Sequence, residues 1–339
     1  MSDFQVTVGG YWASAWGHVG DLEWETVADG GCDTASWSMQ LGNRFAHPAV
    51  KRGARVVITV AGLPVWSGLL SEPDPDEWQF EARGLYTRGN DFLAFDGSLS
   101  SSSNPNVAVD QAIARGLEWT RPASILNDNV GAATPDRLNT VNELLDAYCQ
   151  TAGRRWLVNA AGEVVTYAEP TTPVWHLNPD QGTFGLADDE YSTHLYLRYM
   201  NTSGALATAT ASDAGQAARY GKVERAIDGT TLGPVASITA QAAADGEVAK
   251  GAARLAWTRA LTIRPGQLTT ANGSPAPLWA VKGGDMLRLH GVQESQGLPM
   301  PYTDIVIGEA AYSTVTGQLG VTPVQLAART YADQLGEVA

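Results

Sequence analysis

The side chains that could do chemistry are spread along the sequence rather than grouped. A catalyst needs a nucleophile, or an acid and a base, held within reach of one substrate. The motifs GxSxG, HExxH and GxxxxGK[ST] do not occur. The five histidines are scattered and form no i, i+4 pair: His18, His47, His176, His194 and His290. We therefore predict no catalytic residue, no metal site and no cofactor, and we expect His194 and His290, on predicted strands, to be structural.

Two acidic clusters remain as candidates for a metal site. The run Glu72-Asp74-Asp76-Glu77 could present carboxylates to Ca²⁺, but it lacks the glycine and the spaced bidentate glutamate of an EF-hand loop. Its prolines indicate a stiff, exposed hairpin tip. The run Asp188-Asp189-Glu190 precedes a predicted strand and is expected to be a solvated loop. A glycosidase needs two acids about 5–10 Å apart in a cleft, and the sequence places no such pair.

Cysteine and tryptophan usage points to structural roles. Cys32 and Cys149 lie in different predicted units without a CxxC partner, which indicates two reduced cysteines. Six of the eleven tryptophans fall in the first hundred residues: Trp12, Trp16, Trp24, Trp37, Trp66 and Trp78. Several alternate within predicted strands, so we expect them in the core. A subunit interface and stacking on a glycan are the alternatives for those that are exposed.

Composition and charge exclude several classes of protein. The 339 residues carry a net charge of −14, which disfavours direct nucleic-acid binding because phosphate neutralisation supplies most of that affinity. An acidic channel that nucleic acid passes without sticking remains compatible with this charge. No apolar run approaches the roughly 18 residues of a membrane span. The first residues lack a signal-peptide pattern, so we expect folding in a reducing cytoplasm.

One stretch, Ala49–Leu70, predicts a β-hairpin. A turn at Lys51-Arg52-Gly53 leads into a β-branched run. Gly62 and Pro64 then mark a tight turn before the return strand Val65–Leu70.

The same pattern recurs late in the chain. Ala280–Gly291 repeats the Ala-Val-Lys-x-Gly opening and the strand, and Asp304–Gly308 offers the partner strand. In this alignment Gly308 stands where Gly68 stands in the first copy. We infer two related β-domains, one near each end of the chain.

The pattern along the chain is mainly β with an α+β insert. We predict a first β-domain over 1–97, an α+β insert over 98–170, a β segment with an Ala-rich helical stretch over 171–259, a second β-domain over 260–323 and a tail over 324–339. Further strands are expected at Phe4–Val8, Asp21–Thr26, Thr34–Leu41, Trp78–Ala82, Thr193–Met200, Tyr220–Ile227 and Gln318–Val321.

The insert is predicted to be two helices and a hairpin. Asn104-Pro105 opens the first helix with an N-cap and a proline at N1, and Thr140 with Glu143 forms a capping box for the second. Arg155–Val158 and Val164–Tyr167 supply the hairpin. Later, Gly246 and Gly251 weaken the Ala-rich stretch Ala236–Arg259, which leaves one helix or two short ones.

A duplicated β-domain around an α+β insert, without catalytic sets, resembles the baseplate hub and minor tail proteins of long-tailed phages, most strongly those of actinobacterial phages. The resemblance rests on Gly62–Gly68 (a G-x-x-x-W-x-G hairpin), on the insert with its Gly153-Arg154-Arg155-Trp156 exit, and on the late repeat from Val281 to Gly308 with the terminal Val321-Thr322-Pro323. Together these segments span nearly the whole chain.

This resemblance implies two tail-tube-like β-barrel or sandwich domains flanking the small helix–helix–hairpin domain. It implies a homotrimeric structural protein of the virion tail tip, assembled in the host cytoplasm. Three chains with two tube-like domains each would match a sixfold tube ring. Its implied partners are itself, the distal tail or tail tube protein, tail fibre or spike proteins, and the tape-measure protein, around a channel for DNA.

Three alternatives stay open at this point. A hexameric distal tail protein would need no duplicated domain. A tail module could bind cell-wall glycan through the Trp-rich first domain. A cell-wall hydrolase is disfavoured, because the chain lacks the C-terminal peptidase or lysin extension that many relatives carry.

Overall fold

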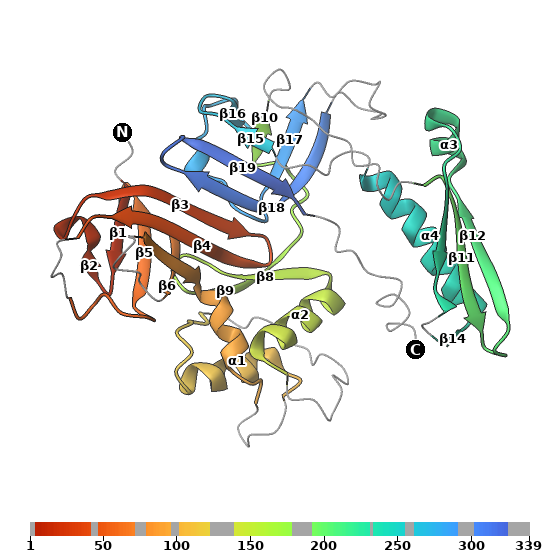
Figure 1. The fold of residues 1–339 in the computed structure, drawn as a ribbon, viewed down its shortest axis with the longest axis horizontal. Helices are drawn as coiled ribbons and strands as arrows, with labels where there is room; N and C mark the ends of the chain where they lie inside the picture. Colours follow the sequence, from red (N-terminus) through yellow and green to blue (C-terminus); the bar gives the residue numbers. More distant parts are fainter. Residues whose placement is uncertain are drawn as a thin grey trace. The chain divides into compact units, whose positions relative to one another are not determined.

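The computed structural model describes residues 4–41, 47–71, 79–95, 102–122, 139–177, 192–230, 233–254, 261–290 and 302–324. The chain forms two compact units (Figure 1). Unit 1 comprises Met1–Leu177, Thr262–Leu287 and Val306–Val321; unit 2 comprises Asn178–Leu261, Arg288–Ile305 and Thr322–Ala339. Both acidic runs considered above, together with Trp78 and residues 325–339, lie outside the described residues.

The predicted mainly β fold with helical insertions is confirmed. The strands of the first part are β1 (Phe4–Val8), β2 (Tyr11–Trp12), β3 (Val19–Val27), β4 (Gly30–Met39), β5 (Arg55–Val60), β6 (Leu63–Leu70), β7 (Gln79–Gly84), β8 (Arg154–Val158), β9 (Val164–Ala168) and β10 (Trp175–Leu177). Those of the later part are β11 (His194–Asn201), β12 (Leu206–Ser212), β13 (Glu224–Asp228), β14 (Pro234–Val235), β15 (Leu261–Ile263), β16 (Leu268–Thr270), β17 (Met286–His290), β18 (Tyr302–Ser313) and β19 (Gln318–Pro323). The α-helices are α1 (Pro105–Ala114), α2 (Val141–Ala152), α3 (Ala214–Tyr220) and α4 (Ser237–Arg254).

The strands of unit 1 belong to one connected sheet. Its order is β16-β10-β17-β18-β3-β4-β7-β6-β5-β1-β2, with β19 paired to β18 and β15, and β8 paired to β4 and β9. The early and late β-segments therefore meet through antiparallel pairing of β18 with β3, in which Ala311 lies opposite Glu25. The five segments predicted from the sequence remain a prediction.

The predicted hairpin is β5–β6, and it turns more tightly than expected. The loop is the two-residue pair Ala61-Gly62, since Val60 already pairs with Leu63. Both loop residues have positive φ, 49° and 80°, which is the backbone of a type I′ turn. Pro64 consequently lies inside the return strand, not in the turn.

The core of unit 1 is aromatic as well as aliphatic. Trp37 and Trp66 are fully buried, and Trp37 stacks on Phe80 with ring centroids 5.5 Å apart. The indole N–H of Trp66 donates to the Glu25 carbonyl at 3.1 Å. Trp24 is 4% exposed. The expectation that most early tryptophans are core residues is thus confirmed for these three.

The helix–helix–hairpin insert forms as predicted, because its signals are local. The Asn104 side chain accepts hydrogen bonds from the N–H groups of Asn106 and Val107 at the start of α1. At α2 the capping box is reciprocal: Thr140 N–H donates to Glu143 Oε2 at 2.8 Å, and Glu143 N–H donates to Thr140 Oγ1 at 3.2 Å. Gly153, at φ 60°, follows the last residue of α2.

Unit 2 is a small sheet covered on one face by a helix. The strand order is β12-β11-β13, with β14 also paired to β11, and α4 packs on β11 and β12. The core between them includes Leu195, Leu197, Tyr199 and the alanine face of α4. None of the described helices has the length and apolarity needed to span a membrane.

In unit 2 one predicted strand needs correction, one strand is additional, and one open alternative is resolved. The strand predicted from Tyr220 begins only at Glu224, because Asp213 caps a helix, α3, that runs to Tyr220. Strand β12 was not predicted. The Ala-rich stretch forms one helix across Gly246 and Gly251, because packing of its alanine face outweighs a glycine cost of about 1 kcal/mol each.

Candidate functional site

The sheet of unit 1 contains one strand arrangement twice. The order β4-β7-β6-β5-β1 in the first part is matched, in the sheet and along the chain, by β15-β19-β18-β17-β10 in the second. Strands β2 and β16 occupy the same end of each set, although β16 follows β15 along the chain whereas β2 precedes β4. We call these two sets the first and second repeat. Strand β3 adds to the first repeat and pairs with β18 of the second. We call the β3–β18 pairing the repeat junction.

Backbone hydrogen bonds confirm that the two predicted turns are equivalent. In the first repeat Ala54 N–H donates to Lys51 O at 3.0 Å; in the second, Asp285 N–H donates to Lys282 O at 3.2 Å. The residue between them makes the matching bond to the return strand: Gly53 to Leu70 O at 2.8 Å, and Gly284 to Ile307 O at 2.7 Å. The turn residues Lys51, Gly53 and Ala54 are each 231 positions before their counterparts Lys282, Gly284 and Asp285, as the sequence alignment required.

The predicted equivalence of Gly308 and Gly68 is wrong. Since Ile307 occupies the place of Leu70, Gly308 occupies the place of Ser71. The Gly308 carbonyl accepts a hydrogen bond from Ala28 N–H at 2.8 Å, beside the repeat junction. The two glycines matched by their letters, although their places in the hairpin differ.

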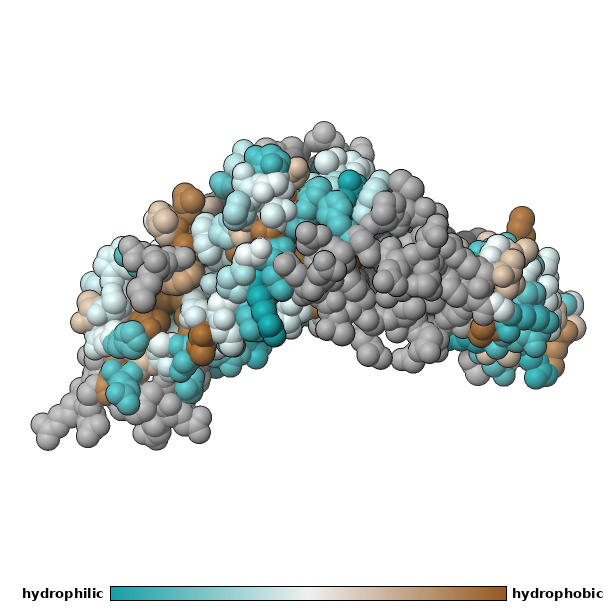
Figure 2. All heavy atoms as spheres, turned by 90° about the horizontal axis from the view of Figure 1, so that it is seen from above, coloured by the Kyte–Doolittle hydropathy of each residue, from teal (hydrophilic) through white to brown (hydrophobic). Residues whose placement is uncertain are grey.

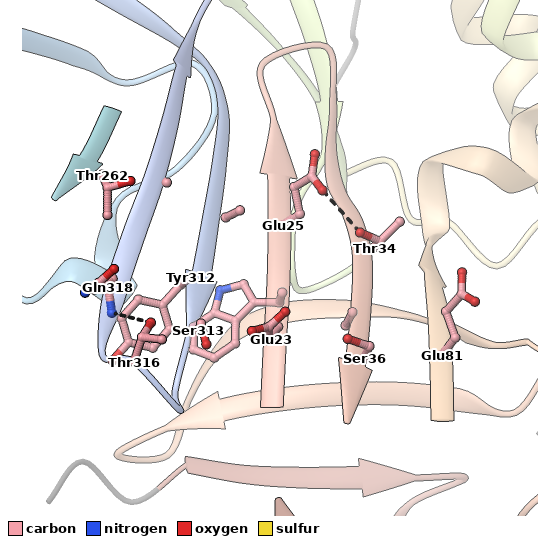
Figure 3. A pocket seen from close by; sticks show the side chains of 14 residues that line it. Glu23, Glu25, Thr34, Ser36, Glu81, Thr262, Tyr312, Ser313, Thr316 and Gln318 are labelled. Atoms are coloured by element: carbon pink, nitrogen blue, oxygen red, sulfur yellow. Dashed lines mark hydrogen bonds between the residues drawn. The ribbon is translucent and has the colours of Figure 1, made fainter. Parts of the chain in front are cut away.

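An acidic hollow of about 510 Å³ lies across the repeat junction. Glu23, Glu25 and Glu81 reach it from β3 and β7. Trp24 and Tyr312, which border it, pack their rings together in the core, with centroids 4.8 Å apart. Figure 3 shows these carboxylates on one side and the polar side chains of β18 and β19 on the other. No lysine or arginine is among the described residues that line it: Glu23, Trp24, Glu25, Thr34, Ala35, Ser36, Glu81, Thr262, Ala311, Tyr312, Ser313, Thr316, Gln318 and Gly320.

Glu25 is the titratable group that this arrangement perturbs most. Its pKa is raised to about 7, first by burial and then by the negative charges of Glu309 on β18 and Asp33. Thr34 Oγ1 donates to Glu25 Oε2 at 3.3 Å, which opposes the shift. The repeat junction therefore carries a carboxyl group that changes charge near neutral pH. Sequence reasoning did not single out Glu25, because the carboxylates around it come from β4 and β18.

Replacing Glu25 by glutamine should make the protein more stable at pH 8 and leave it nearly unchanged at pH 4. The folded-state pKa lies above the unfolded value, so the folded chain binds a proton between about pH 4.5 and 7 that the unfolded chain does not. The wild-type chain therefore loses stability as pH rises through this window, and glutamine mimics the protonated acid. Thermal unfolding at both pH values tests this, with Glu23→Gln as the matched charge control. An equal difference in unfolding temperature at both pH values would contradict it.

The structure does not assemble the histidines or cysteines into a reactive group within the described residues. His194 Nδ1 lies 3.2 Å from Thr193 Oγ1. The His47 ring contacts the rings of Tyr11 and Trp16, with centroid distances of 4.9 Å and 4.7 Å. Both cysteines are free and buried. Burial raises the pKa of Cys32 to about 11 and that of Cys149 to about 12, so both remain thiols.

No metal-binding group was found in the part of the chain that the structure describes. Among these residues no three or more His, Cys, Asp or Glu side chains form a group able to hold an ion. The acidic run 72–77, the calcium candidate considered from the sequence, lies outside them.

Exposed aromatic side chains gather near the β1–β2 turn. Tyr11 is 56% and Trp12 49% exposed, and the Tyr11 ring lies 6.4 Å from that of Trp16. On the face drawn in Figure 2 apolar surface is broken into small patches among hydrophilic residues. Trp12 is the described early tryptophan for which the interface and glycan interpretations stay open.

Comparison by sequence finds no relative, since no protein-family model and no curated protein matches the chain. Comparison by structure finds several. The 43 kDa tail protein of prophage MuSo2 from Shewanella oneidensis superposes with a TM-score of 0.63 at 14% identity, covering 99% of this chain and 100% of that chain.

Two further solved structures give the same result. A tail protein from Neisseria meningitidis matches with a TM-score of 0.56 at 13% identity, covering 98% of this chain and 99% of that one. The prophage tail protein gp18 from Listeria monocytogenes matches with a TM-score of 0.51 at 11% identity, covering 99% of each chain. This chain thus has, over nearly its whole length, a fold found in prophage tail proteins.

Proposed function

We propose that this chain is a structural protein of a phage tail, and that three copies form a hub at the distal end of the tail. The observation that carries the proposal is the strand order that occurs twice in unit 1. Three chains with two repeats each present six related surfaces, which lets a threefold object dock on a sixfold ring. The tail-protein fold of the structural neighbours supports the role in a tail.

In this proposal the hub joins the tail tube or distal tail protein above to fibre or spike proteins below. Its centre is a channel for DNA or the tape-measure protein, and it is located at the virion tail tip after assembly in the host cytoplasm. The net charge of −14 suits a channel wall to which DNA does not adhere. The role is structural and uses no catalytic residue.

The proposal predicts the stoichiometry of the assembly. Native mass spectrometry of the purified chain should give three copies, and a cryo-EM reconstruction should show the two repeats alternating with pseudo-sixfold symmetry. An assembly of six copies would instead indicate a hexameric distal tail protein. A single copy in the particle would contradict both.

Glycan binding is a second candidate, favoured by the exposure of Tyr11 and Trp12 beside Trp16. Aromatic faces of this kind stack on sugar rings. A cell-wall pull-down with the full chain and with Trp12→Ala separates the candidates. Retention that is lost in the variant supports a glycan-binding module, and no retention of either chain argues against it.

A further inference from the structure

Both edges of the small sheet of unit 2 are open. Among the described residues, β11 is the only strand that pairs with β12 or with β13. Strand β12 is seven residues long and contains only leucine, alanine, threonine and serine, without a charge or a proline. A long, uncharged edge of this kind is a template for pairing with another chain, and proteins usually protect such edges with charges, prolines or a covering segment.

The register shows which backbone groups of β12 point outward. Asp213 N–H donates to Thr193 O at 3.0 Å, and Asn201 N–H donates to Ala205 O at 2.8 Å, at the two ends of the β11–β12 pair. Because hydrogen-bonded residues alternate along an antiparallel pair, every second residue of β12 directs its N–H and C=O away from β11. These residues are all exposed: Leu206, Thr208, Thr210 and Ser212.

The Thr210 carbonyl confirms this direction. It accepts a hydrogen bond from Gln241 Nε2 of α4 at 2.8 Å, so it points away from β11. A carbonyl oxygen has two lone pairs, and one of them remains for a further donor. The outward edge of β12 therefore keeps its capacity to pair with a strand.

Strand β13 presents a second and different edge. It runs parallel to β11, and Gly229 N–H donates to Arg198 O at 2.8 Å just beyond its end. The odd-numbered residues of this segment therefore direct their backbone groups toward β11. The outward groups belong to three exposed residues: Glu224, Ala226 and Asp228. Unit 2 thus carries an uncharged edge and an acidic edge on opposite sides of one sheet.

We infer that the β12 edge of one chain pairs with the β13 edge of a second copy of this chain. The inference rests on the proposed hub, since a head-to-tail contact between unlike edges closes into a ring. Charge selects this partner: two copies of β13 would place Glu224 opposite Asp228, whereas the uncharged β12 brings no like charge to β13. Because β12 is antiparallel and β13 parallel to β11, the two edges meet antiparallel around the ring.

One register of this contact suits the side chains. The odd-numbered residues of the three strands pack toward α4, so the outward-directed residues all have their side chains on the opposite face. The preferred register places a hydroxyl beside each carboxylate of β13. Its opposite pairs are Thr208–Asp228, Thr210–Ala226 and Ser212–Glu224. A shift by two residues would instead place Leu206 opposite Asp228.

The two carboxylates can accept these hydroxyl groups. Within the chain, Glu224 uses Oε1 for Tyr196 and Lys222, and Asp228 uses Oδ1 for Thr230. A carboxylate has about four lone-pair sites on its two oxygens, so each group retains capacity for a donor from the neighbouring chain.

Three strands from each of three copies would form a closed ring of nine strands. Helix α4 would lie outside it, because the interior of a closed sheet of about this size has room for side chains only. The charges that face inward are balanced within each chain, since Lys222 contacts Glu224 and Arg198 lies opposite Asp228. A threefold ring lies on the hub axis, so passage of DNA would require the β12–β13 contacts to separate.

A disulfide trap tests the contact in the full chain. In the Thr210→Cys/Ala226→Cys variant the two cysteines of one chain lie on either side of Tyr196, about 10 Å apart, which is too far for a bond within the chain. Opposite residues of two paired chains have Cα atoms about 5.5 Å apart, which suits a disulfide. Oxidation with copper phenanthroline should therefore give covalent trimers on a non-reducing gel. Thr210→Cys alone is the control and should remain a single chain.

A charge exchange at the same edge is the second test. Thr208→Glu places a carboxylate opposite Asp228 of the neighbouring chain and should weaken association about tenfold or more in sedimentation velocity. Thr208→Lys changes the same exposed position and should associate at least as tightly as the wild type. Adding Asp228→Lys to Thr208→Glu should restore the association.

The outcomes separate this inference from the proposed function. A trimeric wild type overturns the contact and leaves the hub intact if the paired cysteines stay unlinked or if Thr208→Glu assembles unchanged. A wild-type dimer would indicate twofold pairing of β12 with β12 and overturns the inference. A wild-type chain that is monomeric at every concentration overturns the hub, and the contact with it.

Discussion

A chain in which alanine replaces Gly84 is expected not to fold. A Cβ on Gly84 would lie 1.5 Å from the Cys32 carbonyl oxygen and 2.4 Å from its carbon. Gly84 has φ −58°, so the obstacle is the neighbouring backbone and not an unusual conformation. Relief would require β7 and β4 to separate, and we expect a loss of more than about 4 kcal/mol. Urea unfolding, or recovery in the insoluble fraction, measures the effect.

Gly116→Ala is the matched control for that experiment. Gly116 has φ 107°, and a Cβ there would meet nothing within 4 Å, so alanine adds backbone strain without a collision. A cost of about 1–2 kcal/mol is expected for this strain. If Gly84→Ala is no more damaging than Gly116→Ala, the close approach of β7 to Cys32 is wrong.

Trp66→Ala is expected to be nearly as damaging, at a cost of about 3–5 kcal/mol. Trp66 is fully buried in the core of the first repeat, and truncation leaves a cavity that the surrounding strands cannot fill. It also removes the donor that the indole N–H offers to the Glu25 carbonyl. Equilibrium denaturation in urea gives the change in the free energy of unfolding.

Two variants divide this effect into its parts. Trp66→Phe keeps most of the apolar volume and loses the hydrogen bond, so its cost should be clearly smaller than that of alanine. Trp12→Ala removes the same side chain from a position that is 49% exposed and should change the free energy of unfolding by about 0.5 kcal/mol or less. Equal losses for Trp12→Ala and Trp66→Ala would show that Trp66 is not a core residue.

The elements that the sequence predicts best are those with local causes. The caps at Asn104 and Thr140 and the presence of a turn at Gly62 depend on residues within a few positions of each other, although Pro64 lies in the strand and not in the turn. Strand β12 was missed because Ala and Thr alternate there without a strong apolar signal, although the period of two was present. The start of α3 was also readable, since Asp213 accepts a hydrogen bond from Gln216 N–H at 2.9 Å.

The glycines show where matching by letters fails. Gly68 and Gly308 both lie in the return strand of their hairpin, but a Cβ on Gly68 would lie 2.1 Å from the Arg83 carbonyl oxygen, whereas Gly308 lies at the place of Ser71. Gly68 pairs with Gly84 across β6 and β7. Only the register of the strands shows that Gly68 lies against a neighbouring backbone and that Gly308 occupies a different position in its hairpin.

By itself the sequence determined the mainly β class, the insert with its capped helices, and the presence of a repeated turn at Lys51 and Lys282, because each depends on residue periodicity or on contacts within one turn. The tertiary structure decided how the repeats are related. The pairing of β3 with β18 joins residues almost 300 positions apart, and no local pattern encodes such a pairing. The same pairing creates the acidic hollow around Glu25, and it covers Gly283 while Gly53 stays exposed. The different surroundings of two similar turns are therefore a property of the fold, because they depend on what the rest of the chain packs against each of them.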